Sequence, residues 1–120
     1  EMWDKVGGFS EEFNPGIGSD PDFNMKLWNN GVRIFKGIND FKVYHFASLT
    51  TRKNTQVVQN RGDNTFLKKW GFTIKFFKRF YMRTNDKYDG PLTEPLKNVP
   101  FYLNLLICKI KLIYINLIRV

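Results

Sequence analysis

Residues 19–31 read Ser-Asp-Pro-Asp-Phe-Asn-Met-Lys-Leu-Trp-Asn-Asn-Gly and carry the clearest helix signals in the chain. Asp20 suits the N-cap position, and Pro21 suits the first helical position. Asp22 falls in the first turn, where the helix dipole favours an anion. Gly31 is a natural C-terminal stop. The stretch therefore predicts one short helix with a carboxylate pair at its start.

The segments around this helix predict a mixed fold. Residues 1–19 are rich in glycine and predict an irregular loop. Residues 32–36 and 41–46 are rich in β-branched and aromatic side chains and predict two strands. Apolar residues at three- and four-residue steps predict a basic amphipathic helix over 64–83. The expected fold class is therefore α/β or α+β.

Composition narrows the possible classes of protein. The chain has 120 residues, of which 42% are hydrophobic and 25% charged, so we expect one globular domain. A single cysteine excludes a disulfide framework and a Cys-rich zinc site. No uninterrupted run of about 20 apolar residues is present, which argues against a clean transmembrane span. A cytoplasmic protein is the default expectation.

The charge is unevenly distributed. Residues 1–50 hold five Lys/Arg and seven Asp/Glu, whereas residues 51–120 hold fourteen Lys/Arg and four Asp/Glu, a net charge of +10. The acidic half could host metal or acid–base chemistry. The basic half could meet phosphates, anionic lipid or nucleic acid, or it could be a solvated surface.

Asp20, Asp22 and His45 are the candidates for chemistry. Two carboxylates two residues apart could perform acid–base work or bind a cation, or they could simply cap the helix and complement its dipole. His45 is the only histidine in the chain. It is either a hydrogen-bonded structural residue or a metal ligand that acts together with the carboxylates.

Three elements in order resemble inverting glycosyltransferases of family two. They are Val6-Gly7-Gly8-Phe9-Ser10-Glu11, then Gly18-Ser19-Asp20-Pro21-Asp22-Phe23 with Lys26, then Val43-Tyr44-His45-Phe46. The resemblance covers about residues 3–53. It implies the C-terminal, acceptor-side part of the nucleotide-sugar-binding α/β fold called GT-A, followed by a basic helical tail.

The resemblance also implies roles for individual residues. Asp20 looks like the catalytic base, and Asp22 looks like the supporting acid of the same motif. Lys26 stands where arginine is usual. Gly7, Gly8 and Phe9 resemble the loop that lines the donor–acceptor cleft.

A metal and substrates are implied as well. His45 resembles a histidine that helps to hold the metal or diphosphate, so Mg²⁺ or Mn²⁺ is expected in the complete enzyme but not in this part. The implied substrates are a nucleotide-sugar donor and a glycan or lipid-linked acceptor. Ser10 and Ser19 depart from the usual aspartate and glutamate, so Asp20 is expected to lack a strong polar partner. Nothing in residues 1–19 resembles the half that binds the donor.

Beyond residue 53 the expected parts are a basic amphipathic region (54–83), a proline-rich linker (84–100) and an apolar helix (101–120). On a helical wheel the polar residues of 101–120 share a sector of about 160° with Cys108, Leu112 and Ile115. This pattern predicts an interfacial or core-packing helix rather than a span. The basic tail suggests peripheral attachment to the inner face of an anionic membrane.

Two other classes of function remain open. A nucleic-acid-binding module would explain the basic, aromatic-rich half, but the aromatics fall on helical spacing and no recognised nucleic-acid motif is present. A non-catalytic remnant, which only binds or does nothing, would explain the missing donor half.

Overall fold

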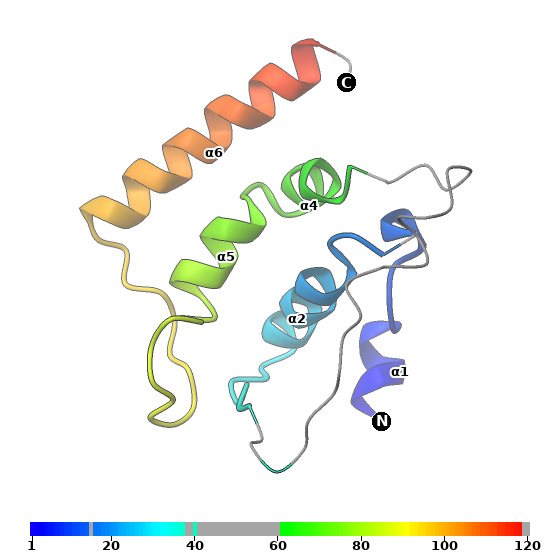
Figure 1. Cartoon of the computed structure of the whole chain (residues 1–120), viewed down its shortest axis with the longest axis vertical. Coiled ribbons are helices and arrows are strands. Elements are labelled where there is room, and N and C mark those ends of the chain that lie inside the picture. The colour runs from blue at the N-terminus through cyan, green and yellow to red at the C-terminus, as the bar shows by residue number, and fades with distance from the viewer. Residues whose placement is uncertain (15, 38–39, 41–60, 119–120) are drawn as a thin grey trace.

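The computed structural model describes residues 1–14, 16–37, 40 and 61–118. In chain order the elements are α1 (Met2–Val6), the 3₁₀ turn η1 (Glu11–Phe13), α2 (Ser19–Asn29), α4 (Gly62–Trp70), α5 (Ile74–Phe80) and α6 (Val99–Leu117). Figure 1 shows α4 and α5 between α2 on one side and α6 on the other. The N-terminal α1 packs on α2, and η1 packs on α4.

The predicted α/β fold class is wrong for this chain. The described residues form five α-helices and the 3₁₀ turn without any strand, so they are not the C-terminal part of a GT-A domain. Residues 32–36 are irregular, and one backbone bond joins them to a distant segment, from the Leu92 amide to the Arg33 carbonyl at 2.8 Å. The Arg33 side chain also bonds Glu94 in the connection between α5 and α6 and the Trp28 carbonyl of α2. The second predicted strand, 41–46, lies outside the described residues.

Helix α2 forms where it was expected, but its start differs in detail. The helix begins at Ser19, and its N-cap is Gly18, which offers no capping side chain. Asp20 and Pro21 therefore lie inside the first turn rather than at the N-cap and first helical positions. Asp22, Met25 and Trp28 face inward at three-residue steps and are buried.

The predicted helix over 64–83 is interrupted. Helix α4 ends at Gly71, which adopts the left-handed conformation with φ of 78°. Helix α5 then starts from a new cap, in which the Thr73 hydroxyl accepts a hydrogen bond from the Phe76 amide at 3.1 Å. The two helices change direction at this break, and the aromatic side chains of both are buried in the same core.

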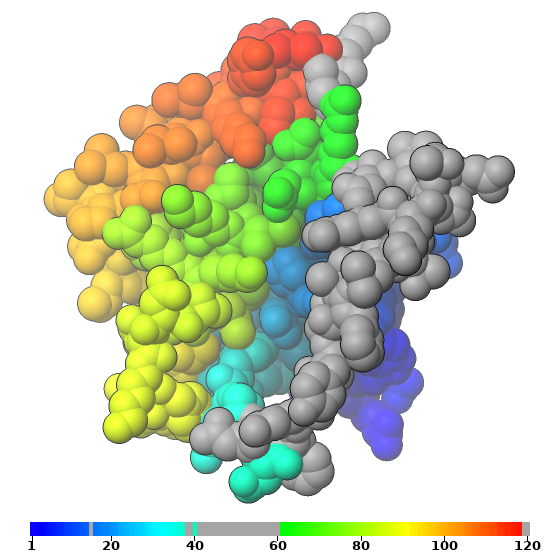
Figure 2. Space-filling model, in the orientation of Figure 1, coloured from blue at the N-terminus to red at the C-terminus, as the bar shows by residue number. Residues whose placement is uncertain are grey.

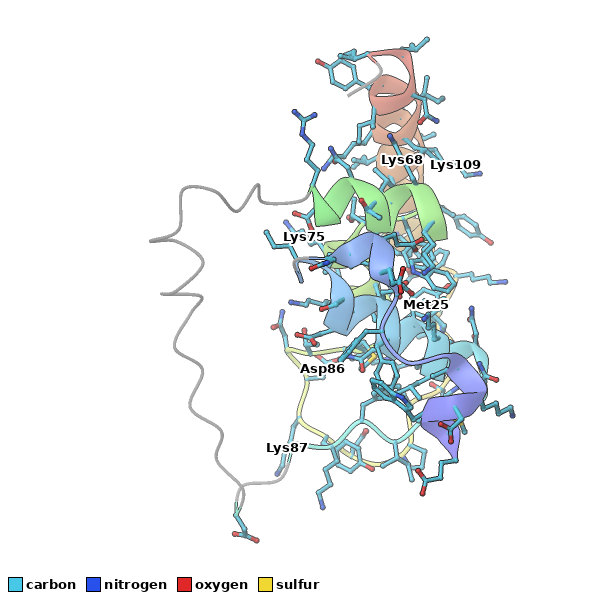
Figure 3. The ribbon with its side chains drawn as sticks, turned by 90° about the vertical axis from the view of Figure 1, so that its right-hand side faces the viewer. Met25, Lys68, Lys75, Asp86, Lys87 and Lys109 are labelled. Atoms are coloured by element: carbon cyan, nitrogen blue, oxygen red, sulfur yellow. The ribbon has the colours of Figure 1, made fainter. Side chains whose placement is uncertain are left out.

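Aromatic side chains from the three C-terminal helices and their connections dominate this core. Its buried members are Phe13, Met25, Phe66, Leu67, Phe72, Phe76, Phe77, Phe101, Cys108 and Ile115. Figure 3 labels one of these residues, Met25 of α2. The apolar stripe predicted over 64–83 is confirmed as buried for Phe66, Leu67 and Phe77, and it is partly buried at Trp70, Ile74 and Tyr81. Phe72 and Phe76, which the stripe did not include, are buried as well.

Gly62 is the point where α4 approaches the loop before α2 most closely. It is buried, and a Cβ atom at this position would overlap the backbone carbonyl of Ile17. A backbone carbonyl cannot swing aside as the end of a flexible side chain can. The contact between these two segments therefore requires glycine.

We predict that Gly62→Ala destabilises the fold by about 1–3 kcal/mol, because the methyl group forces the two backbones apart. Urea unfolding followed by circular dichroism measures the change. Gly37→Ala is the matched control, since a Cβ there meets no atom within 4 Å. Equal midpoints for the two variants would contradict the close approach.

Candidate functional site

The loop after α1 lies against α2 and brings most of the predicted site residues together. Gly7 ends α1 in the left-handed conformation. The Gly8 carbonyl accepts a hydrogen bond from Lys26 Nζ at 3.0 Å. The Phe9 ring lies 5.3 Å from the Phe23 ring, and Trp3 contacts both. The loop is thus fixed to the helix by this hydrogen bond and by aromatic contacts, and Ser10 adds a second hydrogen bond, to Asp22.

Gly8 is confined by its neighbour Trp3. Its φ is +59°, and a Cβ would lie 2.7 Å from the Trp3 ring. Glycine accepts this left-handed backbone without strain. The tight turn aims the Gly8 carbonyl at Lys26, so the glycine pair shapes the loop rather than leaving it open.

Asp22 is the centre of the polar contacts. Its side chain is 0% exposed. One carboxylate oxygen accepts hydrogen bonds from Trp70 Nε1 at 2.8 Å and lies 2.9 Å from Lys69 Nζ. The other accepts a hydrogen bond from the Ser10 hydroxyl at 2.7 Å and lies 3.8 Å from Lys26 Nζ. A fully buried carboxylate is tolerated because donors and cations surround it.

Lys69 extends this network to η1. Its Nζ lies 2.6 Å from Glu12 Oε1 and donates to the Ser10 hydroxyl at 3.0 Å. Burial alone would lower the pKa of Lys69, but its hydrogen bonds to Glu12 and Asp22 and the attraction of these carboxylates outweigh burial and raise the pKa. The ammonium group is therefore held in its charged form by two carboxylates from different segments.

Asp20 contrasts with Asp22, although only one residue separates them. Its side chain is exposed, and in the described part of the chain it has neither a hydrogen bond nor an ion pair. Neighbouring Ser19 donates its hydroxyl proton to the Gly16 carbonyl at 2.7 Å instead. The pair thus splits into one carboxylate that is used internally and one that faces solvent.

An open hollow of about 340 Å³ lies between the loop and the start of α2; Ser19 lines it, whereas neither Asp20 nor Asp22 does. Its walls come from the loop, η1 and the start of α2. They are formed by Phe9, Ser10, Glu11, Phe13, Asn14, Gly16 and Ser19. The hollow could hold one or two sugar rings, since ligand sites start at about 300 Å³.

The described residues do not fit a metal ion. They contain no group of three or more His, Cys, Asp or Glu side chains that could share one. Asp22 has both oxygens engaged by protein donors, and Asp20 stands apart. His45, the predicted metal ligand, lies outside the described residues.

The sequence missed the partners of Asp22. Lys69 and Trp70 lie on α4, 47 and 48 residues further along the chain, and the helical pattern assigned them to a basic face and an aromatic stripe. Ser10 was noted only as a departure from an aspartate. A hydrogen bond from a partly buried indole to a buried carboxylate 48 residues away leaves no periodic pattern in the sequence, so only the fold reveals the contact.

Comparisons with known proteins gave no match: no family model, no curated protein and no solved structure matches the chain. The resemblance to family-two glycosyltransferases therefore stands on the motif residues alone. Its fold implication is overturned by the helices described above. Its chemical implication stays a proposal.

We predict that Asp22→Asn lowers the free energy of unfolding by about 1–3 kcal/mol, because an amide has one acceptor oxygen and must leave either Ser10 or Trp70 without its acceptor in a buried site, while Lys69 keeps Glu12. Asp20→Asn is the matched control and should leave the urea midpoint unchanged, since that side chain is exposed. Equal losses in the two variants would show that the Asp22 contacts do not stabilise the fold.

The raised pKa of Lys69 predicts alkaline sensitivity. The folded state holds this proton more tightly than the unfolded state, so the stabilisation is complete below pH 10.5 and is lost as pH rises through the higher folded-state pKa. Lys69→Met should remove this part of the pH dependence. Tyr81, whose pKa is raised by burial and by Glu94, adds a decline of the same sign that both proteins share. Parallel curves of unfolding free energy against pH for the two proteins would contradict the prediction.

Proposed function

We propose that this chain is the acceptor-side part of an inverting glycosyltransferase, in which Asp20 accepts the proton of the acceptor hydroxyl. One observation carries the proposal. The motif segments, 12 to 18 residues apart, make direct hydrogen bonds, from Ser10 to Asp22 and from Lys26 to the Gly8 carbonyl. The segments that resemble a site thus meet in space.

The proposed reaction is a single displacement. The acceptor oxygen attacks the anomeric carbon of the donor sugar and forms the new glycosidic bond. The bond to the nucleoside diphosphate breaks with its electron pair, and the acceptor proton moves to an oxygen of Asp20. Attack from the face opposite the leaving group inverts the anomeric centre.

The two carboxylates would have different roles in this reaction. An exposed carboxylate can reach a hydroxyl group, and Asp20 is exposed and has no side-chain partner among the residues that the structure describes. Asp22 is a positioning residue, because its buried oxygens bind the loop and α4. Lys26 holds the loop through Gly8. The exposed Phe9 and the adjacent hollow offer an acceptor surface.

The nucleotide-sugar donor and its Mg²⁺ or Mn²⁺ are assigned to none of the described residues. The proposal therefore concerns the acceptor side and the base alone. The proposal rests on the motif residues and does not depend on the α/β fold. Because nucleotide-sugars are the donors, the proposal places the reaction in the cytoplasm, with a glycan or lipid-linked acceptor.

The test uses the full-length gene product that contains this chain. Incubation with UDP-, GDP- and dTDP-activated hexoses and a glycan acceptor mixture should release nucleoside diphosphate, which a coupled assay detects for any sugar. Asp20→Asn should reduce turnover by about 10²-fold or more while the urea midpoint stays unchanged.

The control is Asp86→Asn, which alters an exposed carboxylate in the loop between α5 and α6. It should keep full turnover. Full turnover of Asp20→Asn would refute the base. Absence of turnover with every donor, in a folded wild-type protein, would favour the non-catalytic remnant.

A further inference from the structure

Helix α6 has two apolar faces, and only one of them is packed. Phe101, Cys108 and Ile115 recur at seven-residue steps and are buried against α4 and α5. The opposite face is apolar as well and is more than half exposed at every position. It consists of Tyr102, Leu103, Leu106, Ile107, Ile110, Ile113, Tyr114 and Leu117, which we call the outward face.

The outward face is apolar, whereas the solvent-facing side of a surface helix in a water-soluble domain is polar. At about 100° per residue its eight side chains span about 140° without a polar residue. Lys109 and Lys111 project to its two borders, on opposite sides of the helix. A helix at the surface of a soluble domain turns polar residues outward. In α6 the sector that holds the polar residues of the helical wheel also holds the buried Cys108 and Ile115, so this sector faces the core and the apolar sector faces outward.

Helix α6 also lies at an outer edge of the molecule. Figure 1 shows it beyond α4 and α5, and Figure 2 shows its side chains on the surface. A contiguous apolar surface of eight large residues marks a site that binds a membrane or another protein. The charges beside the outward face indicate which of the two it binds.

Cations line a groove at the border of the outward face. The groove has a volume of about 380 Å³ and lies between α5 and α6. Lys75, Arg79 and Lys111 line it together with Ile107 of the outward face, and Asp63 is the one carboxylate in its wall. Lys78 continues the positive charge into the adjoining hollow. Positive charge beside an apolar helix face complements lipid phosphates beside acyl chains.

We propose that the outward face of α6 inserts into the interface of an anionic lipid bilayer, with the α5–α6 groove binding lipid headgroup phosphates. The helix has 19 residues and a mean hydropathy of 1.3, so length and composition alone would also let it span. Spanning would place Lys109 and Lys111 near the bilayer centre, where a cation is most costly. Lying in the interface leaves both lysines at the level of the headgroups.

Vesicle co-sedimentation of the 120-residue chain tests the proposal. The chain should sediment with mixed phosphatidylcholine–phosphatidylglycerol vesicles and much less with phosphatidylcholine alone. Binding should weaken in about 1 M NaCl, where the Debye length falls to about 3 Å. Equal recovery on both vesicles, or recovery on neither, would overturn the proposal.

Substitutions in the outward face test the apolar part. Leu106→Gln with Ile113→Gln should reduce the partition coefficient by about 10-fold or more, because both side chains leave water on insertion. Ile34→Gln with Leu96→Gln is the matched control and changes two apolar side chains outside α6 that are at least as exposed. Equal reductions by the two pairs would refute the outward face as the inserted surface.

Substitutions in the groove test the headgroup contacts. Lys75→Gln with Arg79→Gln should reduce binding to the mixed vesicles by about 10- to 30-fold and leave binding to neutral vesicles unchanged. Lys5→Gln with Lys87→Gln removes the same net charge outside the groove and should have a small effect. Figure 3 shows Lys87 far from Lys109. Equal effects of the two pairs would refute the groove.

A second copy of the chain is the competing occupant. Sedimentation equilibrium without lipid distinguishes it. A monomer supports the proposal, whereas a dimer that Leu106→Gln and Ile113→Gln dissociate would assign the outward face to self-association and overturn it.

Discussion

The buried carboxylate of Asp22 is the contact on which the N-terminal half depends. A charged group without solvent exposure must find its donors within the protein. Ser10 supplies one from the loop, and Lys69 and Trp70 supply two from α4. These segments, which also share the apolar core through Phe13, Met25 and Phe66, are thereby joined at a single polar side chain. The aromatic core of α4, α5 and α6 then provides the rigid support for this junction.

The same contact explains why two neighbouring carboxylates differ. Asp22 points into the core side of α2 with Met25 and Trp28, whereas Asp20 lies on the solvent side of the same turn. Stability and reactivity are therefore assigned to different side chains, which is what the proposed base requires. The second proposal depends on another part of the molecule, because α6 lies on the far side of α4 and α5 (Figure 1).

Local signals were predictable, and long-range contacts were not. Helix α2 follows from the cap and stop signals of residues 19–31, although its N-cap is Gly18 and not Asp20. The apolar pattern of 66–81 correctly predicted the burial of Phe66 and Phe77. The break at Gly71 was missed, because a lone glycine in an amphipathic pattern is compatible with a continuous helix. The strand over 32–36 was wrong because Arg33 bonds α2 and Glu94 instead of pairing in a sheet. The sequence suggested that Asp22 mattered, but Lys69 and Trp70 could not be found without the fold.

Native-state hydrogen exchange in the wild-type protein tests the central role of Asp22 most directly. If Asp22 joins the loop, α2 and α4, the amides of Phe13, Met25 and Trp70 belong to one cooperative unit. They should then exchange with a common free energy of opening and the same dependence on denaturant. A loop amide that opens at much lower free energy, while α2 and α4 stay protected, would contradict the account.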